Sequence, residues 1–244
     1  MALKVNEQSP QVAAMAKNWP IAAALLGGTQ AMRDAGAKFL PRQPREEVED
    51  WEYRIGVATL FPAWERTLNV MSGKPFSKQL TLTEDVPTEL VEWLEDCDLE
   101  GRNLHTFGSE MLSESMAFGL AGVLVDCPRV GDVRTKAEEK AIGVRPYLVQ
   151  VNHDQILGWK SKRINGVLML TQLRIAETAQ VDDGEYGSSA VKRVRVLTPN
   201  KWELWQAPDK EGKDYVLFEE GVTTLGVIPF VPFYGKRDEF MEGC

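Results

Sequence analysis

The residues best suited to acid–base chemistry in this 244-residue sequence are its two histidines, His105 and His153. A histidine that is oriented by a carboxylate can act as a general base, and Asp154 or Asp126 could in principle complete such a dyad. A nucleophile would also be needed, and no Ser or Cys lies in a recognisable nucleophile elbow. We therefore expect neither histidine to be catalytic, and we keep an enzyme with an unrecognised site as an alternative.

Two groups of carboxylates could bind a cation or repel an anion. Asp182–Glu185 lacks the alternating oxygen ligands and the terminal glutamate of a calcium loop, which favours a solvated hairpin tip. Glu95, Asp96, Asp98 and Glu100 follow one another at the end of a predicted helix, where the helix dipole disfavours negative charge. This pattern is typical of a solvated face. The functional alternative is a surface that repels another polyanion.

No motif predicts a cofactor or a metal ion. Gly27-Gly28-Thr29 follows no strand and precedes no Gly-Lys-Ser/Thr, so helix flexibility or close packing explains it better than phosphate binding. Cys97, Cys127 and Cys244 are odd in number and form no CxxC group, which predicts reduced thiols in a cytoplasmic setting. We expect Cys127 to be buried and inert. The sequence thus predicts no catalytic, cofactor-binding or metal-binding residue.

The net charge of −8 is concentrated in the first half of the chain. Residues 1–128 contain 11 Lys+Arg and 19 Asp+Glu, whereas residues 129–244 contain 17 of each. A protein that grips phosphates is expected to show the opposite balance, so tight nucleic-acid binding is disfavoured. The longest apolar runs, Ile21–Leu26 and Gly226–Tyr234, are too short to span a bilayer, and the N-terminus does not resemble a signal peptide. We expect no membrane partner.

Helical patterns dominate before residue 130. Ser9-Pro10 is typical of a helix start, and Trp19-Pro20 predicts the end of that first helix, with a second helix running to about Gly36. Gln43–Gly73 reads as one long helix that Pro62 kinks or divides. Its apolar stripe consists of Val48, Trp51, Ile55, Ala58, Phe61, Trp64, Leu68 and Met71.

Two more helices are predicted in this half, and a strand follows them. A short amphipathic helix is expected to end at Gly101. The next helix, over Asn103–Phe118, runs directly into a buried strand at Gly122–Val125, which Pro128 closes.

After residue 144 the hydrophobic period becomes two. The expected strands are Arg145–Val151, Lys160–Ile164, Val167–Ile175, Val191–Leu197, Trp202–Trp205, Tyr215–Glu219 and Leu225–Tyr234. Asn165-Gly166 predicts a type I′ hairpin, and Pro208–Lys213 predicts a turn. Val130–Gly143 and Val181–Ser189 are expected to be disordered or mobile. The sequence therefore predicts an α+β fold with a helical part (1–128), a charged linker (129–144) and a β-rich part with a mostly antiparallel sheet (145–244).

Seven tryptophans are many for this length. We expect those at helical spacing, such as Trp19, Trp51 and Trp64, to belong to the core. Trp202 and Trp205 are expected on opposite sides of one strand, which leaves one of them for a partner interface.

Five segments in order resemble portal proteins, the head-to-tail connectors of tailed bacteriophages, and in particular a portal-like subgroup described as a domain of unknown function. The first segment contains an LP-x-x-P turn and an acidic helix with Tyr and Arg, here Leu40, Pro41, Pro44, Glu46, Tyr53 and Arg54. The complete set is Gly28–Arg54, Phe61–Phe76, Phe118–Pro128, Arg145–Trp159 and Ile228–Tyr234.

The resemblance implies a subunit of a dodecameric ring at one capsid vertex, through which double-stranded DNA is packaged and ejected without sequence-specific binding. The implied partners are copies of the chain itself, the capsid protein, the terminase packaging motor, and head-completion or tail proteins. The implied location is the virion, and the host cytoplasm during assembly. The matched part is similar to the N-terminal wing.

Family members continue into a clip, a stem and a crown that have no counterpart in this sequence. We therefore expect a fragment, a natural truncation or a second half supplied separately, with Leu225–Tyr234 leading toward the stem as an unpaired edge. The alternatives to a portal subunit are another virion adaptor or interaction module with a wing-like fold, and the enzyme considered above.

Overall fold

The computed structural model describes residues 3–128, 143–207 and 214–243. Its helices come first and its antiparallel sheets follow, so the predicted α+β class is confirmed. The predicted turn at Pro208–Lys213 and nearly all of the predicted mobile segment Val130–Gly143 lie outside the described residues, as do most of the predicted linker and Cys244.

The helices are short, and turns or glycines separate them. They are α1 (Pro10–Met15), α2 (Trp19–Leu26), α3 (Gly28–Ala35), the 3-10 turn η1 (Gly36–Lys38), α4 (Val48–Val57), α5 (Ala63–Gly73), α6 (Thr88–Glu95) and α7 (Leu104–Phe118). Pro62 lies at the N-cap of α5, which confirms that this proline divides the predicted long helix. It has no backbone N–H to donate, so it is tolerated at a helix start and not inside a helix.

The helix boundaries near the N-terminus differ from those predicted. Trp19-Pro20 begins α2 instead of ending α1, because a proline in the first turn needs no donor. The second helix breaks at Gly27-Gly28, where Gly28 has a φ of 72°. A Cβ on Gly27 would lie 2.5 Å from Cβ of Ala31, so close packing between α2 and α3 accounts for this glycine. Further along the chain, α6 ends at Glu95, well before Gly101.

Ser9 caps α1 and ties it to the sheet. Its Oγ accepts a hydrogen bond from Val12 N at 3.4 Å, and its own N–H donates to the Leu157 carbonyl at 2.7 Å. We expect Ser9→Ala to lower the free energy of unfolding by about 1 kcal/mol, because the buried cap acceptor is lost. Urea denaturation checks this result against Ser77→Ala, an exposed position. Equal stability of the two variants would contradict it.

Within the described residues, ten strands form three antiparallel sheets. They are β1 (Leu120–Asp126), β2 (Tyr147–Val151), β3 (Ile156–Ile164), β4 (Val167–Asp183), β5 (Gly187–Thr198), β6 (Lys201–Gln206), β7 (Val216–Val222), β8 (Phe230–Tyr234), β9 (Arg237–Glu239) and β10 (Glu242–Gly243), with the 3-10 turn η2 (His153–Gln155) before β3. The strand orders are β2-β1-β8, β3-β4-β5-β6-β7 and β10-β9. β8 pairs with β1 on one side and is an edge of its sheet.

Two hairpins of the large sheet bear on the predictions made from the sequence. Asn165 and Gly166 have φ values of 49° and 84°, which the predicted type I′ turn between β3 and β4 requires. The segment Val181–Ser189 was expected to be mobile, but β4 continues to Asp183 and β5 begins at Gly187. Asp182 and Asp183 pair with Ser188 and Gly187, so the prediction of a disordered segment is wrong. The carboxylates lie at an exposed hairpin tip, as their sequence predicted.

The main core forms where α1, α2 and the two larger sheets meet. Its fully buried residues include Val12, Leu120, Ile156, Leu173 and Met241. Helix α7 delivers β1 into this core because Gly119, with a φ of 90°, ends the helix. Helix α7 also packs on the other face of β1, where Phe107 and Met111 meet Ala121 and Val123.

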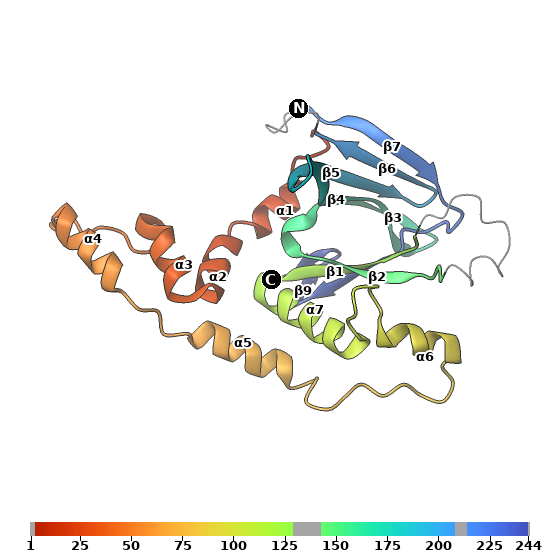
Figure 1. The fold of residues 1–244 in the computed structure, drawn as a ribbon, viewed down its shortest axis with the longest axis horizontal. Coiled ribbons are helices and arrows are strands. Elements are labelled where there is room, and N and C mark those ends of the chain that lie inside the picture. The colour runs from red at the N-terminus through yellow and green to blue at the C-terminus, as the bar shows by residue number, and fades with distance from the viewer. Residues whose placement is uncertain (1–2, 129–142, 208–213, 244) are drawn as a thin grey trace.

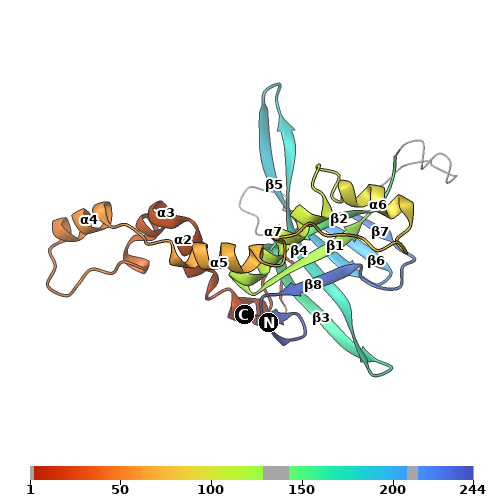
Figure 2. The ribbon, with the colours of Figure 1, turned by 90° about the horizontal axis from the view of Figure 1, so that it is seen from below.

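The helices between α2 and α5 form a long projection. Figures 1 and 2 show α3 and α4 reaching away from the sheets, while α5 returns toward α7. We call residues 28–62 the arm. We call the part that holds the sheets with α1, α6 and α7 the body.

Candidate functional site

The two histidines lie far apart. His105 is in the first turn of α7, where its Nδ1 accepts a hydrogen bond from Leu80 N at 3.3 Å and its ring meets Phe76 edge-on. His153 contacts Glu114 and Phe118, in the last turns of the same helix. Glu114 follows His105 by nine positions in the helix, which separates the two residues by about 14 Å along the helix axis. The two histidines therefore do not form a pair.

His153 joins three elements at the base of the projection. Its Nδ1 lies 2.6 Å from Oε1 of Glu114, and its ring stacks on Phe118 with centroids 3.6 Å apart. Trp19 meets the same ring edge-on and donates from Nε1 to the Phe118 carbonyl at 3.0 Å. The partner carboxylate is thus Glu114, and neither Asp154 nor Asp126 completes the considered dyad. The arrangement is suited to holding α2 against α7.

Asp126 belongs to a different contact, between two sheets. Its Oδ2 accepts from Arg195 Nη1 at 2.7 Å, and Arg195 also pairs with Glu177. Burial lowers the pKa of Arg195, but these two carboxylates outweigh it and raise the pKa overall, so the guanidinium stays charged. Burial, with the nearby Asp126 charge, also raises the pKa of Tyr147.

A cleft of about 570 Å³ opens beside this contact. Asp126, Cys127 and Arg195 line it, together with Trp202 of β6. Cys127 is exposed, which corrects the expectation that it is buried, because β1 leaves the core at Val125 and its last residues face solvent. Trp205 lines another cavity, as expected if it faces away from Trp202.

The acidic run before α7 is only partly a solvated face. Asp98 is 6% exposed, and its Oδ1 accepts from the backbone N–H groups of Glu100 and Arg102 at 2.9 and 3.1 Å. Asp96 accepts from Gly101 N and pairs with Arg145, while Glu95 and Glu100 are exposed. The solvated-face interpretation is therefore wrong for Asp98, the most buried carboxylate of the run.

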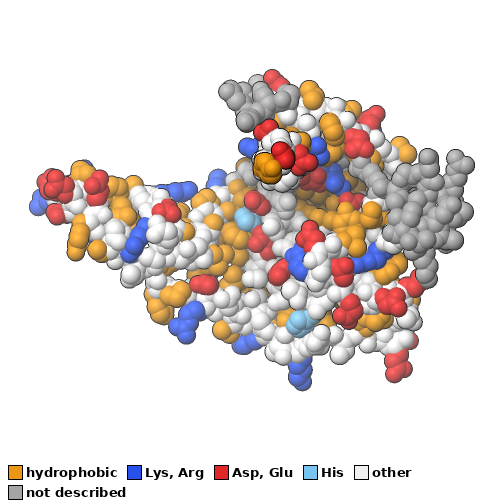
Figure 3. Space-filling model, viewed as in Figure 1, with side chains coloured by type: hydrophobic (Ala, Val, Ile, Leu, Met, Phe, Trp, Pro, Cys, Tyr) orange, Lys and Arg blue, Asp and Glu red, His pale blue; other side chains and the backbone are white. Residues whose placement is uncertain are grey.

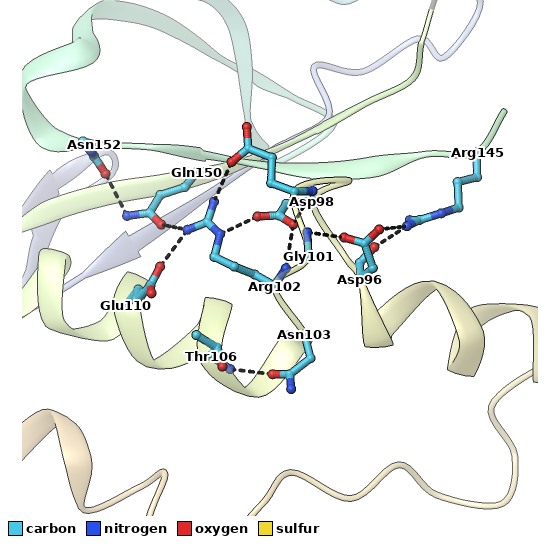
Figure 4. A network of polar contacts seen from close by, with 11 residues as sticks. Asp96, Asp98, Gly101, Arg102, Asn103, Thr106, Glu110, Arg145, Gln150 and Asn152 are labelled. Carbon is cyan, nitrogen blue, oxygen red and sulfur yellow. Dashed lines mark hydrogen bonds and ion pairs between the residues drawn. The ribbon is translucent and has the colours of Figure 1, made fainter. Parts of the chain in front are cut away.

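Arg102 is the centre of this network, as Figure 4 shows. Its guanidinium pairs with Asp98, donates to Glu110 at 2.7 Å and to Gln150 at 3.1 Å, and lies over the ring of Phe107. Arg102 belongs to none of the motifs described from the sequence. Its only local signal is the spacing of four residues from Asp98, because Gln150 is remote in the chain. The network joins the α6–α7 loop to β2.

The described residues contain no group of three His, Cys, Asp or Glu side chains that could hold a metal ion. Within the same ranges, no helix has the length and apolar character that crossing a membrane requires. Comparison of the chain with known protein families finds no match, and comparison with curated proteins finds no similar sequence.

The arm is braced by its own polar contacts. Arg54 forms a two-pronged ion pair with Glu46 at 2.7 and 2.9 Å and donates to the Pro41 carbonyl. The hydrogen bond from Arg54 is the main reason that the pKa of Glu46 falls to about 2. Trp51 donates from Nε1 to the Leu40 carbonyl at 2.8 Å. Five residues of the segment Gly28–Arg54 thus hold the free end of the arm together.

A second set of contacts joins the two sides of the arm. Arg33 Nε on α3 donates to the Ala58 carbonyl at 2.8 Å, and Leu60 N donates to Oγ1 of Thr29 at 3.1 Å. These bonds fix the chain after α4 against α3. The arm is therefore a defined element with its own hydrogen bonding, and its surface has a set shape.

That surface is unusually apolar for residues so far from the core. Val48, Tyr53, Val57 and Phe61 are 50%, 73%, 53% and 73% exposed. Figure 3 shows hydrophobic side chains along the arm and acidic side chains at its far end. Of the predicted apolar stripe only Leu68 is buried, and Trp64 is exposed, so the prediction that helically spaced tryptophans belong to the core is right for Trp19 and wrong for Trp64. Exposed apolar groups on a braced element are typical of a protein-interaction surface.

Proposed function

We propose that this protein is a structural subunit that assembles with copies of itself, and that the assembly is the portal ring of a tailed bacteriophage. The observation that carries the proposal is the braced arm with four large apolar side chains exposed to solvent. A single copy gains nothing from this exposure, whereas a neighbouring copy can remove the apolar surface from water.

The positions of the portal-like segments support the proposal. Phe118–Pro128 contains β1, Arg145–Trp159 contains β2, and Ile228–Tyr234 contains β8. These three strands, which come from distant parts of the sequence, form one sheet in the order β2-β1-β8. The residues that carry the likeness therefore act together as one folding unit, as expected if they describe a shared wing.

In this proposal the chain has no catalytic residue and no cofactor. Its partners are further copies, the capsid protein, the terminase motor and head-completion or tail proteins. It functions in the virion and assembles in the host cytoplasm. Double-stranded DNA passes through the ring without sequence-specific binding, and the net charge of −8 suits passage because it repels phosphates.

Purified protein tests this function directly. We expect light scattering coupled to size exclusion to give a mass of many subunits, and negative-stain images to show closed rings with a central hole. Open or small assemblies would favour the virion adaptor instead. A stable monomer at all concentrations would contradict self-assembly, and turnover of a substrate would favour the enzyme.

A further inference from the structure

The outward face of α4 combines acidic and apolar side chains. Glu49, Glu52 and Tyr53 are spaced three and four residues apart, so they share one side of the helix, and Val57 continues it. Trp51, which donates to the Leu40 carbonyl and braces the arm, lies on the opposite side of α4. Both glutamates are exposed, and neither has an ion-pair partner in the described part of the chain.

The β3–β4 hairpin has a face of the opposite charge. In its register Lys162 pairs with Met169 and Ile164 pairs with Val167, and paired residues point to the same side of a sheet. Lys160, two positions earlier, joins this face. Ile164 and Val167 are 41% and 63% exposed, and neither lysine has an ion-pair partner among the described residues.

The local sequence makes this hairpin the basic counterpart of α4. No Asp or Glu occurs between Asp154 and Glu177, whereas Lys160, Lys162 and Arg163 stand within four residues of one another. Two copies of a chain with a net charge of −8 repel each other overall, and the excess of carboxylates lies in residues 1–128. This basic hairpin is therefore a favourable place for the acidic face of α4 to dock.

The two faces cannot meet within one molecule. Figures 1 and 2 show α4 at one end of the molecule and the β3–β4 hairpin on the other side of the body. Complementary surfaces at separate places on one chain produce a head-to-tail contact, which closes into a ring or continues as a filament.

We propose that the outward face of α4 in one copy docks on the hairpin face of the next copy. Glu49 and Glu52 then lie opposite Lys160 and Lys162, and Tyr53 packs against Ile164 and Val167. This inference rests on the proposed self-assembly and specifies which surfaces carry it. Charged pairs fix the register of the contact, and the aromatic and aliphatic groups supply most of its affinity.

Charge reversal tests the contact in the full chain. The arm variant is E49K/E52K and the hairpin variant is K160E/K162E. Each places like charges opposite each other, so we expect the dissociation constant between copies to rise roughly tenfold to hundredfold. A chain with all four changes restores the attraction and has the original net charge, and we expect it to assemble like the unaltered protein. Analytical ultracentrifugation over a concentration series measures these constants.

A mixture of the two variants is the sharpest test. A head-to-tail contact predicts that neither variant assembles alone. Mixed together, the two variants should assemble in alternation, because each contact then pairs lysines with glutamates. D182K/D183K is the matched control, since it makes the same charge change as the arm variant at the tip of the β4–β5 hairpin. We expect this control to assemble like the unaltered chain. Circular dichroism verifies that every variant is folded.

The outcomes separate this inference from the proposed function. Closed rings that still form in every charge-reversal variant would contradict the proposed contact but not the portal function. A mixture that does not recover assembly would do the same. Open chains that depend on the reversals would support the contact and contradict the ring. An unaltered protein that never associates would contradict both.

Discussion

Replacing Phe107 by alanine is expected to lower the free energy of unfolding by about 3–5 kcal/mol. The side chain is 2% exposed and packs with Met111, Ala121 and Val123, so its removal leaves a cavity between α7 and β1. The ring also lies under the guanidinium of Arg102, at 5.2 Å from the ring centroid. One substitution thus weakens both the apolar cluster and the support of the polar network above it.

Urea denaturation followed by tryptophan fluorescence measures this loss, at one fixed protein concentration because self-association adds to apparent stability. Tyr186→Ala is the control, since Tyr186 is 94% exposed at the β4–β5 turn. Its stability is expected to stay within about 0.5 kcal/mol of the unaltered chain. A loss below about 1 kcal/mol for Phe107→Ala would mean that α7 is not anchored to β1 through this ring.

Replacing Asp98 by asparagine is expected to lower the free energy of unfolding at neutral pH by about 2–4 kcal/mol. Asparagine retains the size of the side chain but removes the charge that faces Arg102. Glu110 and Gln150 still contact the guanidinium. The loss of free energy of unfolding is therefore smaller than for a buried charge left without any partner.

The same substitution has a defined pH dependence. Burial raises the pKa of Asp98, but hydrogen bonds from the N–H groups of Glu100 and Arg102 and from the Arg102 side chain outweigh it, so the pKa lies below its ordinary 3.8. A carboxyl group with a lowered folded-state pKa stabilises the fold above its unfolded value and loses that effect as the pH falls through the folded value. The unaltered chain should therefore exceed the variant in stability at neutral pH and lose this advantage below the lowered pKa.

Urea midpoints from neutral pH down to strong acid measure this convergence. Asp182→Asn is the control, because it makes the same chemical change at an exposed position. A difference in stability that stays constant down to the lowest pH would contradict the role assigned to the Asp98 charge.

Local patterns predicted the elements whose causes are local. The helical spacing before Gly119 predicted α7, and Asn165-Gly166 predicted the turn between β3 and β4, because in each case neighbouring residues determine the backbone conformation. The predicted end of the first helix at Trp19-Pro20 was wrong, because this pair of residues is compatible with either the end or the start of a helix.

The polar network and the arm were not predictable in the same way. Arg102 and Gln150 are 48 positions apart, and only the packing of α7 on the sheet brings them together. The apolar stripe around Phe61 predicted an amphipathic helix, but an apolar face looks the same in sequence whether it meets a core or another molecule. Hence the sequence indicated the helices of the arm without indicating that they leave the body.

The middle strand of the β2-β1-β8 sheet has a consequence for synthesis. β1 ends at Asp126, but its second neighbour, β8, begins only at Phe230. During translation the ribosome must therefore deliver the whole segment from β2 to β8 before β1 gains both hydrogen-bonding partners. Until then one edge of an apolar strand is open, and chaperones or a neighbouring nascent chain have time to reach it.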